Sequence, residues 1–276
     1  MMSMSRRLLL SCLLLSSPAT AFLAPQTAHA FSRPAVSAAA SSTAVPAVYK
    51  KVFVAGGSRG VGRCIIEQLL KQGVQVVAMV RNEAVMAELN AMEGVTAKLG
   101  DAFHQKQVEN VMDGCDAAIT TLGGSTSDET GKRVDYDGNS NVVESAGILG
   151  VVRVILVSSI GCGSSKEAAP PAVFEALKEV LDAKERAENV LIKYYTNTNW
   201  TIIRPGGLKS EPATGKAILT EDYKAIGSIH REDVAALVLQ ALESTNTERK
   251  ILSAVDPSIE SAVSPDGRVL EAFALA

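Results

Sequence analysis

Acidic residues are missing from the start of this 276-residue chain, because no aspartate or glutamate precedes Glu67. The chain opens instead with Arg6 and Arg7, followed by an apolar run from Leu8 to Leu15 that one serine and one cysteine interrupt. This run is too short for a transmembrane helix, which takes about 20 residues. A basic start, a short apolar core and small residues around Ala19 predict a secretory signal peptide.

The segment that follows, to about Val48, is rich in serine, alanine and proline and has the composition of a transit peptide. A signal peptide followed by such a segment, with Phe22 at the junction, resembles the bipartite plastid presequence of algae with complex plastids. A second junction of this kind ends at Phe31. We therefore predict that residues 1–48 direct the protein to the plastid through the secretory route. Ordinary secretion with a disordered linker is the alternative.

Cysteine is scarce: of four in the chain, Cys64, Cys115 and Cys162 remain after the presequence. An odd number without ligand spacing predicts neither a disulfide framework nor a zinc site, and we expect no metal. Cys162, in a glycine-rich stretch, is the candidate for a reactive thiol.

A basic surface is also missing. Removal of the first 45 residues takes away three arginines and no acid, so the net charge falls from −3 to −6. An acidic chain argues against a nucleic-acid partner. We also expect no integral membrane span in the mature chain; association with the thylakoid or envelope membranes stays open, as does the oligomeric state.

The remaining sequence is organised around one stretch, Lys50–Gly62, which reads KKVFVAGGSRGVG. An apolar strand, a glycine-rich turn and the start of an amphipathic helix follow one another. Such a turn lets a pyrophosphate approach the bare backbone at a helix N-terminus. We predict a dinucleotide site that includes Gly56, Gly57, Ser58, Arg59, Gly60, Val61 and Gly62.

The choice of dinucleotide depends on Arg81, which stands at the end of the second apolar strand, nineteen residues after Gly62. An acid at this place would accept from the ribose of NAD, whereas arginine pairs with the 2′-phosphate of NADP. A second arginine, Arg59 in the glycine turn, also favours a phosphate, so we predict NADP(H) as the cofactor. The alternative is that Arg81 only ends a strand.

Strand and helix patterns alternate along the chain and predict one α/β domain over residues 49–256, a Rossmann-like doubly wound parallel sheet, with a loosely held tail at 257–276. Ligands of such sheets lie at the carboxyl ends of the strands. Further residues expected there are Asp101, Ala102, Thr121, Leu122, Gly123, Ser158, Ser159, Pro205, Gly206 and Gly207.

Three segments carry more specific expectations. Residues 162–171 form a candidate flexible lid, and residues 208–229 are expected to be irregular and to line the substrate side. Residues 172–195 are expected to form a long helix. Its predicted buried face comprises Val173, Leu177, Val180, Leu181, Ala187 and Leu191.

Five segments together resemble the atypical branch of the short-chain dehydrogenase/reductase superfamily. They are AGGSRGVG in the glycine turn, VDYDGNSNVVESA, VVRVILVSSIG, AKERAENVL and TIIRPGGL, in this order. The biliverdin-reductase-B-like, NmrA-like and plastid-import-associated members are most similar. The resemblance spans nearly all of residues 50–255 and implies an NADPH-dependent reductase.

The chain departs from this family in its catalytic residues. Active members use a serine, a tyrosine and a lysine, with the tyrosine four residues before the lysine. The matching lysine is Lys184, but residue 180 is valine, which cannot transfer a proton. The resemblance implies that Ser159 orients the substrate and Lys184 the ribose. Tyrosines considered as a replacement acid, but more typical of packing, are Tyr136, Tyr194 and Tyr195.

Three functions follow from this pattern. The first is hydride transfer from NADPH to a small conjugated acceptor, with the proton taken from water or from the substrate. The second is a non-catalytic NADP(H)-binding protein that senses redox state or acts in assembly as a scaffold. The third, an isomerase or epimerase, is the least favoured because the tyrosine is absent.

Overall fold

The structure is a computed structural model that describes residues 49–276 except 125–129, 260–263, 265 and 276. The predicted presequence, residues 1–48, lies outside the described residues. The elements, in chain order, are β1 (Lys51–Ala55), α1 (Gly60–Lys71), β2 (Gln75–Val80), α2 (Glu83–Asn90), β3 (Val95–Leu99), α3 (Gln105–Met112), β4 (Ala117–Thr120), the π-helix η1 (Val134–Gly138), α4 (Asn139–Ile148), β5 (Arg153–Val157), the 3₁₀-helix η2 (Gly163–Ala168), α5 (Pro171–Tyr194), β6 (Asn199–Pro205), β7 (Gly207–Lys209), β8 (Ile218–Thr220), β9 (Ser228–His230), α6 (Arg231–Glu243), the 3₁₀-helix η3 (Thr245–Thr247) and β10 (Lys250–Val255).

The main sheet confirms the predicted fold class. Its eight strands have the order β3-β2-β1-β4-β5-β6-β10-β8, and all neighbours are parallel except β10 and β8. In β1, Val54 pairs with Ala78 of β2 on one side and with Ile119 of β4 on the other. The strand order therefore reverses at β1, and a doubly wound sheet binds its ligand at the carboxyl ends beside such a reversal.

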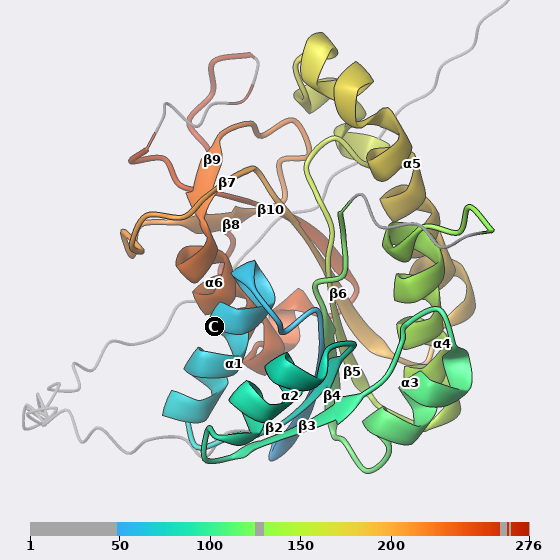
Figure 1. Ribbon diagram of the computed structural model, residues 1–276. Coiled ribbons are helices and arrows are strands. Elements are labelled where there is room, and N and C mark those ends of the chain that lie inside the picture. The colour runs from blue at the N-terminus through green and yellow to red at the C-terminus, as the bar shows by residue number, and fades with distance from the viewer. Residues whose placement is uncertain (1–48, 125–129, 260–263, 265, 276) are drawn as a thin grey trace, which may run out of the picture. The chain divides into compact units, whose positions relative to one another are not determined.

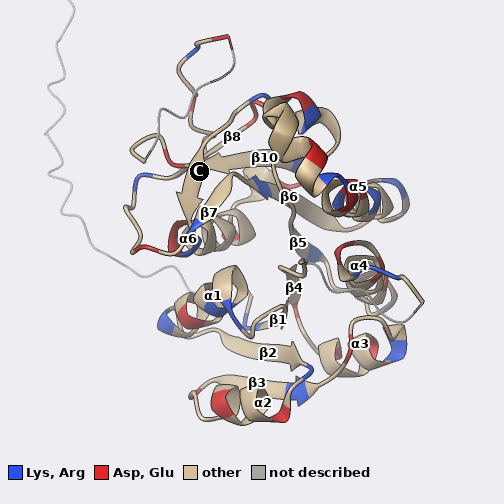
Figure 2. Cartoon of the chain, turned by 45° about the horizontal axis from the view of Figure 1, so that its top comes forward, with Lys and Arg blue, Asp and Glu red and all other residues tan. Residues whose placement is uncertain are grey.

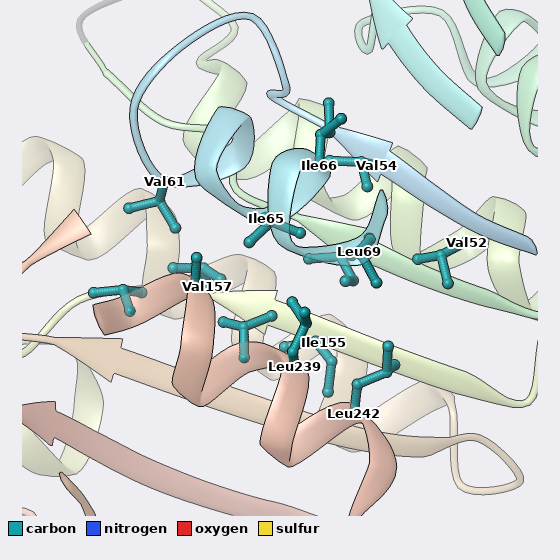
Figure 3. Packing of buried hydrophobic residues seen from close by; sticks show 14 of the residues in the cluster. Val52, Val54, Val61, Ile65, Ile66, Leu69, Ile155, Val157, Leu239 and Leu242 are labelled. Carbon is teal, nitrogen blue, oxygen red and sulfur yellow. The ribbon is translucent and has the colours of Figure 1, made fainter. Parts of the chain in front are cut away.

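Helices cover both faces of the sheet (Figure 1), with α1 and α6 on one face and α3, α4 and α5 on the other (Figure 2). On the first face, Ile65 and Leu69 of α1 pack against Leu239 and Leu242 of α6 above the buried strands, as Figure 3 shows. These side chains are nearly inaccessible to water, so each contributes about 1.5–3 kcal/mol of burial free energy. The packing holds the first residues of α1 and α6 close together.

The segment after β6, expected to be irregular, contains three short strands. Two of them, β7 and β9, form a separate parallel pair in which Leu208 faces Ile229. The third, β8, joins the edge of the main sheet. Strands of three residues are too short to show the alternation that identifies a strand in a sequence. The expectation of irregular structure was therefore wrong for these residues.

The predicted lid is also more ordered than expected, because most of it forms η2. Ser165 is buried, its hydroxyl donates to the carbonyl of Cys162 at 2.8 Å, and it accepts from the amide of Gly161 at 3.0 Å. Arg204 of β6 donates to the Ser164 hydroxyl at 2.8 Å. These bonds fix the segment against β6, so the expectation of a flexible lid is not met up to Ala168.

The predicted buried face of α5 is buried only in the second half of the helix, while the first half buries Phe174, which was not predicted, against Cys162 and Leu181. Leu181, Ala187 and Leu191 are buried, whereas Val173 and Leu177 are 47% and 44% exposed. The first turns of α5 extend past the sheet (Figure 1), so their apolar side chains have no strand to pack on. Periodicity alone cannot show where along a helix the sheet ends.

Each edge of the main sheet is covered in part by the chain itself. At the β3 edge, the Asn90 side chain makes two hydrogen bonds to the backbone of Ala97, at 2.7 and 3.1 Å. At the β8 edge, the amide of Phe273 donates to the carbonyl of Leu219 at 2.7 Å, and Leu270 is buried against Val255. The described part of the C-terminal segment is therefore docked and not loosely held.

No helix in the described parts of the chain is both long enough and apolar enough to cross a membrane. Lysine and arginine alternate with aspartate and glutamate on the outer helices, so the view in Figure 2 shows no surface of a single charge sign.

Candidate nucleotide-binding site

The turn between β1 and α1 has a backbone conformation that favours glycine. Gly56 and Gly60 have φ angles of +88° and +61°, a region in which other residues are strained. A Cβ on Gly62 would lie 2.3 Å from the carbonyl oxygen of Gly56. Thr121, after β4, closes the turn because its hydroxyl donates to the carbonyl of Ala55 at 3.1 Å. The chain thus presents bare backbone where a diphosphate would approach.

The start of α1 favours an anion. Arg59 is in the N-cap position, its side chain makes no capping hydrogen bond, and the first turn carries no acid. The unsatisfied N–H groups and the helix dipole therefore keep a positive potential at this end.

The glycine turn opens onto a cavity of about 430 Å³ along the carboxyl ends of β1 to β6. Nearly every residue predicted to bind the cofactor or to act in catalysis lines it: Gly56, Ser58, Arg59, Gly60, Val61, Gly62, Arg81, Asp101, Ala102, Thr121, Leu122, Gly123, Ser158, Ser159, Lys184, Pro205 and Gly206. The structure thus brings together residues from six strand ends, as a doubly wound sheet requires.

Two residues predicted to bind the cofactor, Gly57 and Gly207, do not line this cavity, and their role stays a prediction. Gly57 is turned toward α1, since a Cβ there would lie 2.4 Å from the Cδ1 of Ile66. Gly207 starts β7, where a Cβ would lie 3.3 Å from the Ser228 hydroxyl. Gly57 therefore leaves room for the close approach of α1 to the turn, whereas Gly207 is exposed.

The cavity also contains residues that the sequence did not identify, and the most informative is Arg231 at the start of α6. The others are Met79, Val80, Gly100, Val134 and Val157, while Leu208 belongs to the segment that was expected to line the substrate side. Within the described residues, Arg59, Arg81 and Arg231 have no carboxylate within 4.0 Å. Three guanidinium groups thus line one cavity without a carboxylate partner in the part of the chain that the structure describes.

Lys184 reaches the cavity from α5 and is held by two groups. Its ammonium donates to the carbonyl of Leu122 at 3.1 Å and lies 3.6 Å from Asp135 Oδ1. Asp135 is fully buried, and its other oxygen, Oδ2, has no hydrogen-bond partner among the described residues. The position of Lys184 over Gly123 agrees with a role beside the bound cofactor.

The α5 turn that carries Lys184 is fixed by an ion pair that the sequence did not reveal. Glu188, one helical turn further on, accepts two hydrogen bonds from Arg204 of β6 at 3.0 and 2.6 Å. The side chains are only 2% and 3% exposed. A bidentate pair of this kind sets the position of one element relative to another.

The two serines after β5 lie at the cavity, but Cys162 does not act as a reactive thiol. Ser159 donates to the carbonyl of Ile160 at 2.9 Å, and Ser158 Oγ lies 3.6 Å from Cys162 Sγ. Cys162 is fully buried, and burial is the main reason that its pKa is raised to about 12. The thiol is therefore protonated at neutral pH and a poor nucleophile.

No tyrosine replaces the missing acid in the cavity lining. Residue 180 is valine, as read from the sequence. Tyr136 stacks under the guanidinium of Arg186 at 3.7 Å, Tyr194 is 74% exposed, and Tyr195 packs on Gly147. None of the three lines the cavity.

Beside Arg231, three potential metal ligands, His230, Asp233 and Asp256, lie within 4.8 Å of one another. Their carboxylates already accept hydrogen bonds: Asp233 from the amides of Thr214 and Gly215, and Asp256 from Ser258. This arrangement fastens residues 214–215 to the start of α6 and to the end of β10.

Comparison with known proteins identifies the class to which this cavity belongs. Residues 56–245 match the NAD(P)H-binding family, and the chain belongs to that family. The predicted atypical short-chain dehydrogenase/reductase is confirmed, as is a nicotinamide dinucleotide as the cofactor. The glycine cradle, the free helix N-terminus and the unpaired guanidinium groups all fit this ligand.

Individual relatives span nearly the same domain. The chain is 35% identical over 205 residues to YhfK, an uncharacterised sugar epimerase of Bacillus subtilis, covering 72% of this chain and 91% of that protein. It is 34% identical over 217 residues to an uncharacterised chloroplastic protein of Arabidopsis thaliana, covering 75% and 76%. Among solved structures, ChuY, an anaerobilin reductase of Escherichia coli O157:H7, is 28% identical with a TM-score of 0.69, and the match covers 77% and 100%.

Proposed function

We propose that this protein is an NADPH-dependent oxidoreductase that transfers hydride to a small conjugated acceptor. The observation that carries the proposal is the glycine-turn cavity, into which Arg59 and Arg81 project without a carboxylate partner among the described residues. The bound cofactor supplies the hydride at its nicotinamide, and the protein supplies binding and orientation.

Cofactor choice follows from the end of β2. Arg81 stands where an NAD-specific fold has an acid, and Arg59 stands on the adjacent turn. An additional 2′-phosphate would pair with these groups through charge-assisted hydrogen bonds, each stronger than a neutral one. NADP(H) is thus preferred to NAD(H).

At the other end of the cavity, the chain offers positioning groups but no phenolic acid. Lys184, held by Leu122 and Asp135, orients the cofactor ribose, and the Ser159 hydroxyl orients the acceptor. With Val180 in the place of the tyrosine, the proton comes from water or from the acceptor. Such a site suits a conjugated carbonyl, quinone, flavin or tetrapyrrole-like acceptor, because the anion formed when hydride adds to it is delocalised and can take its proton from water. The similarity to an anaerobilin reductase supports this class.

We propose that the protein acts in the plastid. A relative is named as chloroplastic, and residues 1–48 have the composition of a bipartite presequence. The secretory route of an alga with complex plastids rests on this sequence pattern.

The test is an assay of the purified protein with NADPH and a panel of flavin, quinone and tetrapyrrole acceptors, followed at the nicotinamide absorbance. We expect NADPH oxidation that depends on the acceptor and is slower with NADH. A Lys184→Met variant should lose most of this rate, while Lys71→Gln, at the far end of α1, should retain it.

The absence of a tyrosine from the cavity lining favours one other function, an NADP(H)-binding protein without turnover that senses redox state or acts in assembly. Tight NADPH binding with no oxidation by any acceptor in the panel would favour this second function. Failure to bind either nucleotide would contradict both.

A further inference from the structure

Arg231, the first residue of α6, lies directly over the glycine turn. Its Nε and Cδ atoms lie 3.7 and 3.8 Å from the position that a Cβ on Gly60 would occupy. Gly60 is the first residue of α1, so this guanidinium stands at the positive end of that helix. It lines the same cavity as Arg59.

The position of Arg231 is fixed from both sides. Its Nη1 donates to the hydroxyl of Ser210 at 2.7 Å, just after β7. The backbone next to it is anchored because His230 is buried and Asp233 accepts from the amides of Thr214 and Gly215 at 2.9 and 3.0 Å. The side chain is therefore held in place before any ligand binds.

The neighbouring acids do not neutralise it. Glu232 accepts from the amide of Ala213, and Asp233 accepts from Thr214 and Gly215, so both carboxylates are directed to the 213–215 segment. No carboxylate in the described chain lies within 4.0 Å of Arg231. The positive charge of Arg231 is repelled by the N-terminus of α1 and by Arg59. An anion bound between these groups would remove the repulsion.

We propose that Arg231 binds the diphosphate of the nicotinamide dinucleotide, a contact separate from recognition of the 2′-phosphate. The inference rests on the proposed function, because it needs a dinucleotide in the cavity. Its position over Gly60 assigns it to the phosphates at the α1 N-terminus, whereas Arg81 at the end of β2 faces the adenosine ribose. Since NADPH and NADH share the diphosphate, Arg231 contributes equally to both.

The same contact links the cofactor to the acceptor side. Arg231 bonds Ser210, and the adjoining Leu208 of β7 lines the cavity. A diphosphate bound to this guanidinium adds a further contact to the side chain that already bonds Ser210, and so it should steady residues 207–215 further. Nucleotide binding should therefore slow amide hydrogen exchange in this segment.

The experiment compares wild type, Arg231→Gln and Lys71→Gln by calorimetric titration with NADPH and with NADH. Lys71 is exposed at the opposite end of α1 and serves as the matched loss of one positive charge. We expect Arg231→Gln to weaken both nucleotides by roughly tenfold or more, with the NADPH-to-NADH ratio unchanged. Lys71→Gln should leave both affinities unchanged, and Arg231→Lys should restore part of the loss.

Amide hydrogen exchange on the same proteins tests whether nucleotide binding steadies residues 207–215 through Arg231. Added NADPH should protect residues 207–215 in wild type but not in Arg231→Gln, whose circular dichroism must match that of wild type. A loss confined to NADPH would mean that Arg231 reads the 2′-phosphate and would overturn the proposal. Unchanged affinities for both nucleotides would also overturn it while leaving the proposed function intact. If wild type binds neither nucleotide, the proposed function itself fails.

Discussion

The two ends of the cavity differ in whether their cationic side chains have carboxylate partners. At the phosphate end, Arg59, Arg81 and Arg231 face the cavity with no carboxylate partner among the described residues. At the acceptor end, Lys184 lies beside Asp135, and the nearby Arg204 is paired with Glu188. One end is thus prepared for an anion from outside, and the other is neutralised before anything binds. Unpaired cations mark binding, whereas paired ones mark positioning.

The largest expected effect is on stability and comes from removing the ion pair between Arg204 and Glu188. Glu188→Ala leaves the buried Arg204 guanidinium without its carboxylate partner, and we expect the unfolding free energy to fall by roughly 3–5 kcal/mol. Denaturant unfolding followed by circular dichroism measures this. The double variant Glu188→Leu with Arg204→Met should recover most of the loss, because no charge is then buried. A single variant as stable as wild type would contradict the structural role of the pair.

The next largest effect is on NADPH affinity and comes from a change in the glycine turn. Gly62→Ala places a methyl group against the carbonyl of Gly56 and should distort the phosphate cradle. We expect NADPH affinity to fall about 100-fold, or ~2.7 kcal/mol, in calorimetric titration. Gly73→Ala is the matched control: it follows the far end of α1, where an added Cβ would have no atom within 4 Å, and should bind within about twofold of wild type. Equal losses in both variants would mean that the cavity has been assigned wrongly.

A smaller and more selective effect tests cofactor choice. Arg81→Asp replaces the cation that we propose pairs with the 2′-phosphate by an acid, so NADPH affinity should fall by roughly 10–100-fold. NADH lacks that phosphate, so its affinity should fall by less than about threefold. Titration of both nucleotides into both proteins gives the ratio. Equal losses would remove Arg81 from the recognition of the phosphate.

The smallest expected effect is at Cys162. Because burial raises its pKa to about 12, iodoacetamide at pH 8 should not modify it in the folded protein but should do so after unfolding. The folded state keeps this proton to higher pH than the unfolded chain, whose thiol titrates near 8.5. This contribution to stability is complete below that pH and is lost as the pH rises toward 12. Rapid alkylation of the folded protein would contradict the burial.

The sequence predicted the phosphate end well because its signals are local. The strand, the glycine turn and the helix start follow one another within thirteen residues from Lys50 to Gly62. Arg81 was found by its spacing from this turn. Both signals depend on short-range chain geometry, and the structure places both at the cavity.

Long-range packing explains what the sequence did not predict. Arg231 is 171 positions beyond Gly60 in the printed numbering, and only the contact between α1 and α6 brings the two together. The partner of Arg204 and the exposure of Val173 likewise depend on where α5 crosses the sheet. No periodicity in a helix encodes which of its residues meet another element.

The covered sheet edges have a consequence for solubility. Unpaired backbone groups on an outer strand can recruit a strand from another molecule and so start aggregation. Here the side-chain amide of Asn90 hydrogen-bonds to the backbone of Ala97 at one edge. At the opposite edge, the backbone amide of Phe273 donates to the carbonyl of Leu219. Truncation of the chain before Leu270 would expose β8, so a shortened protein should be more prone to self-association than the intact one.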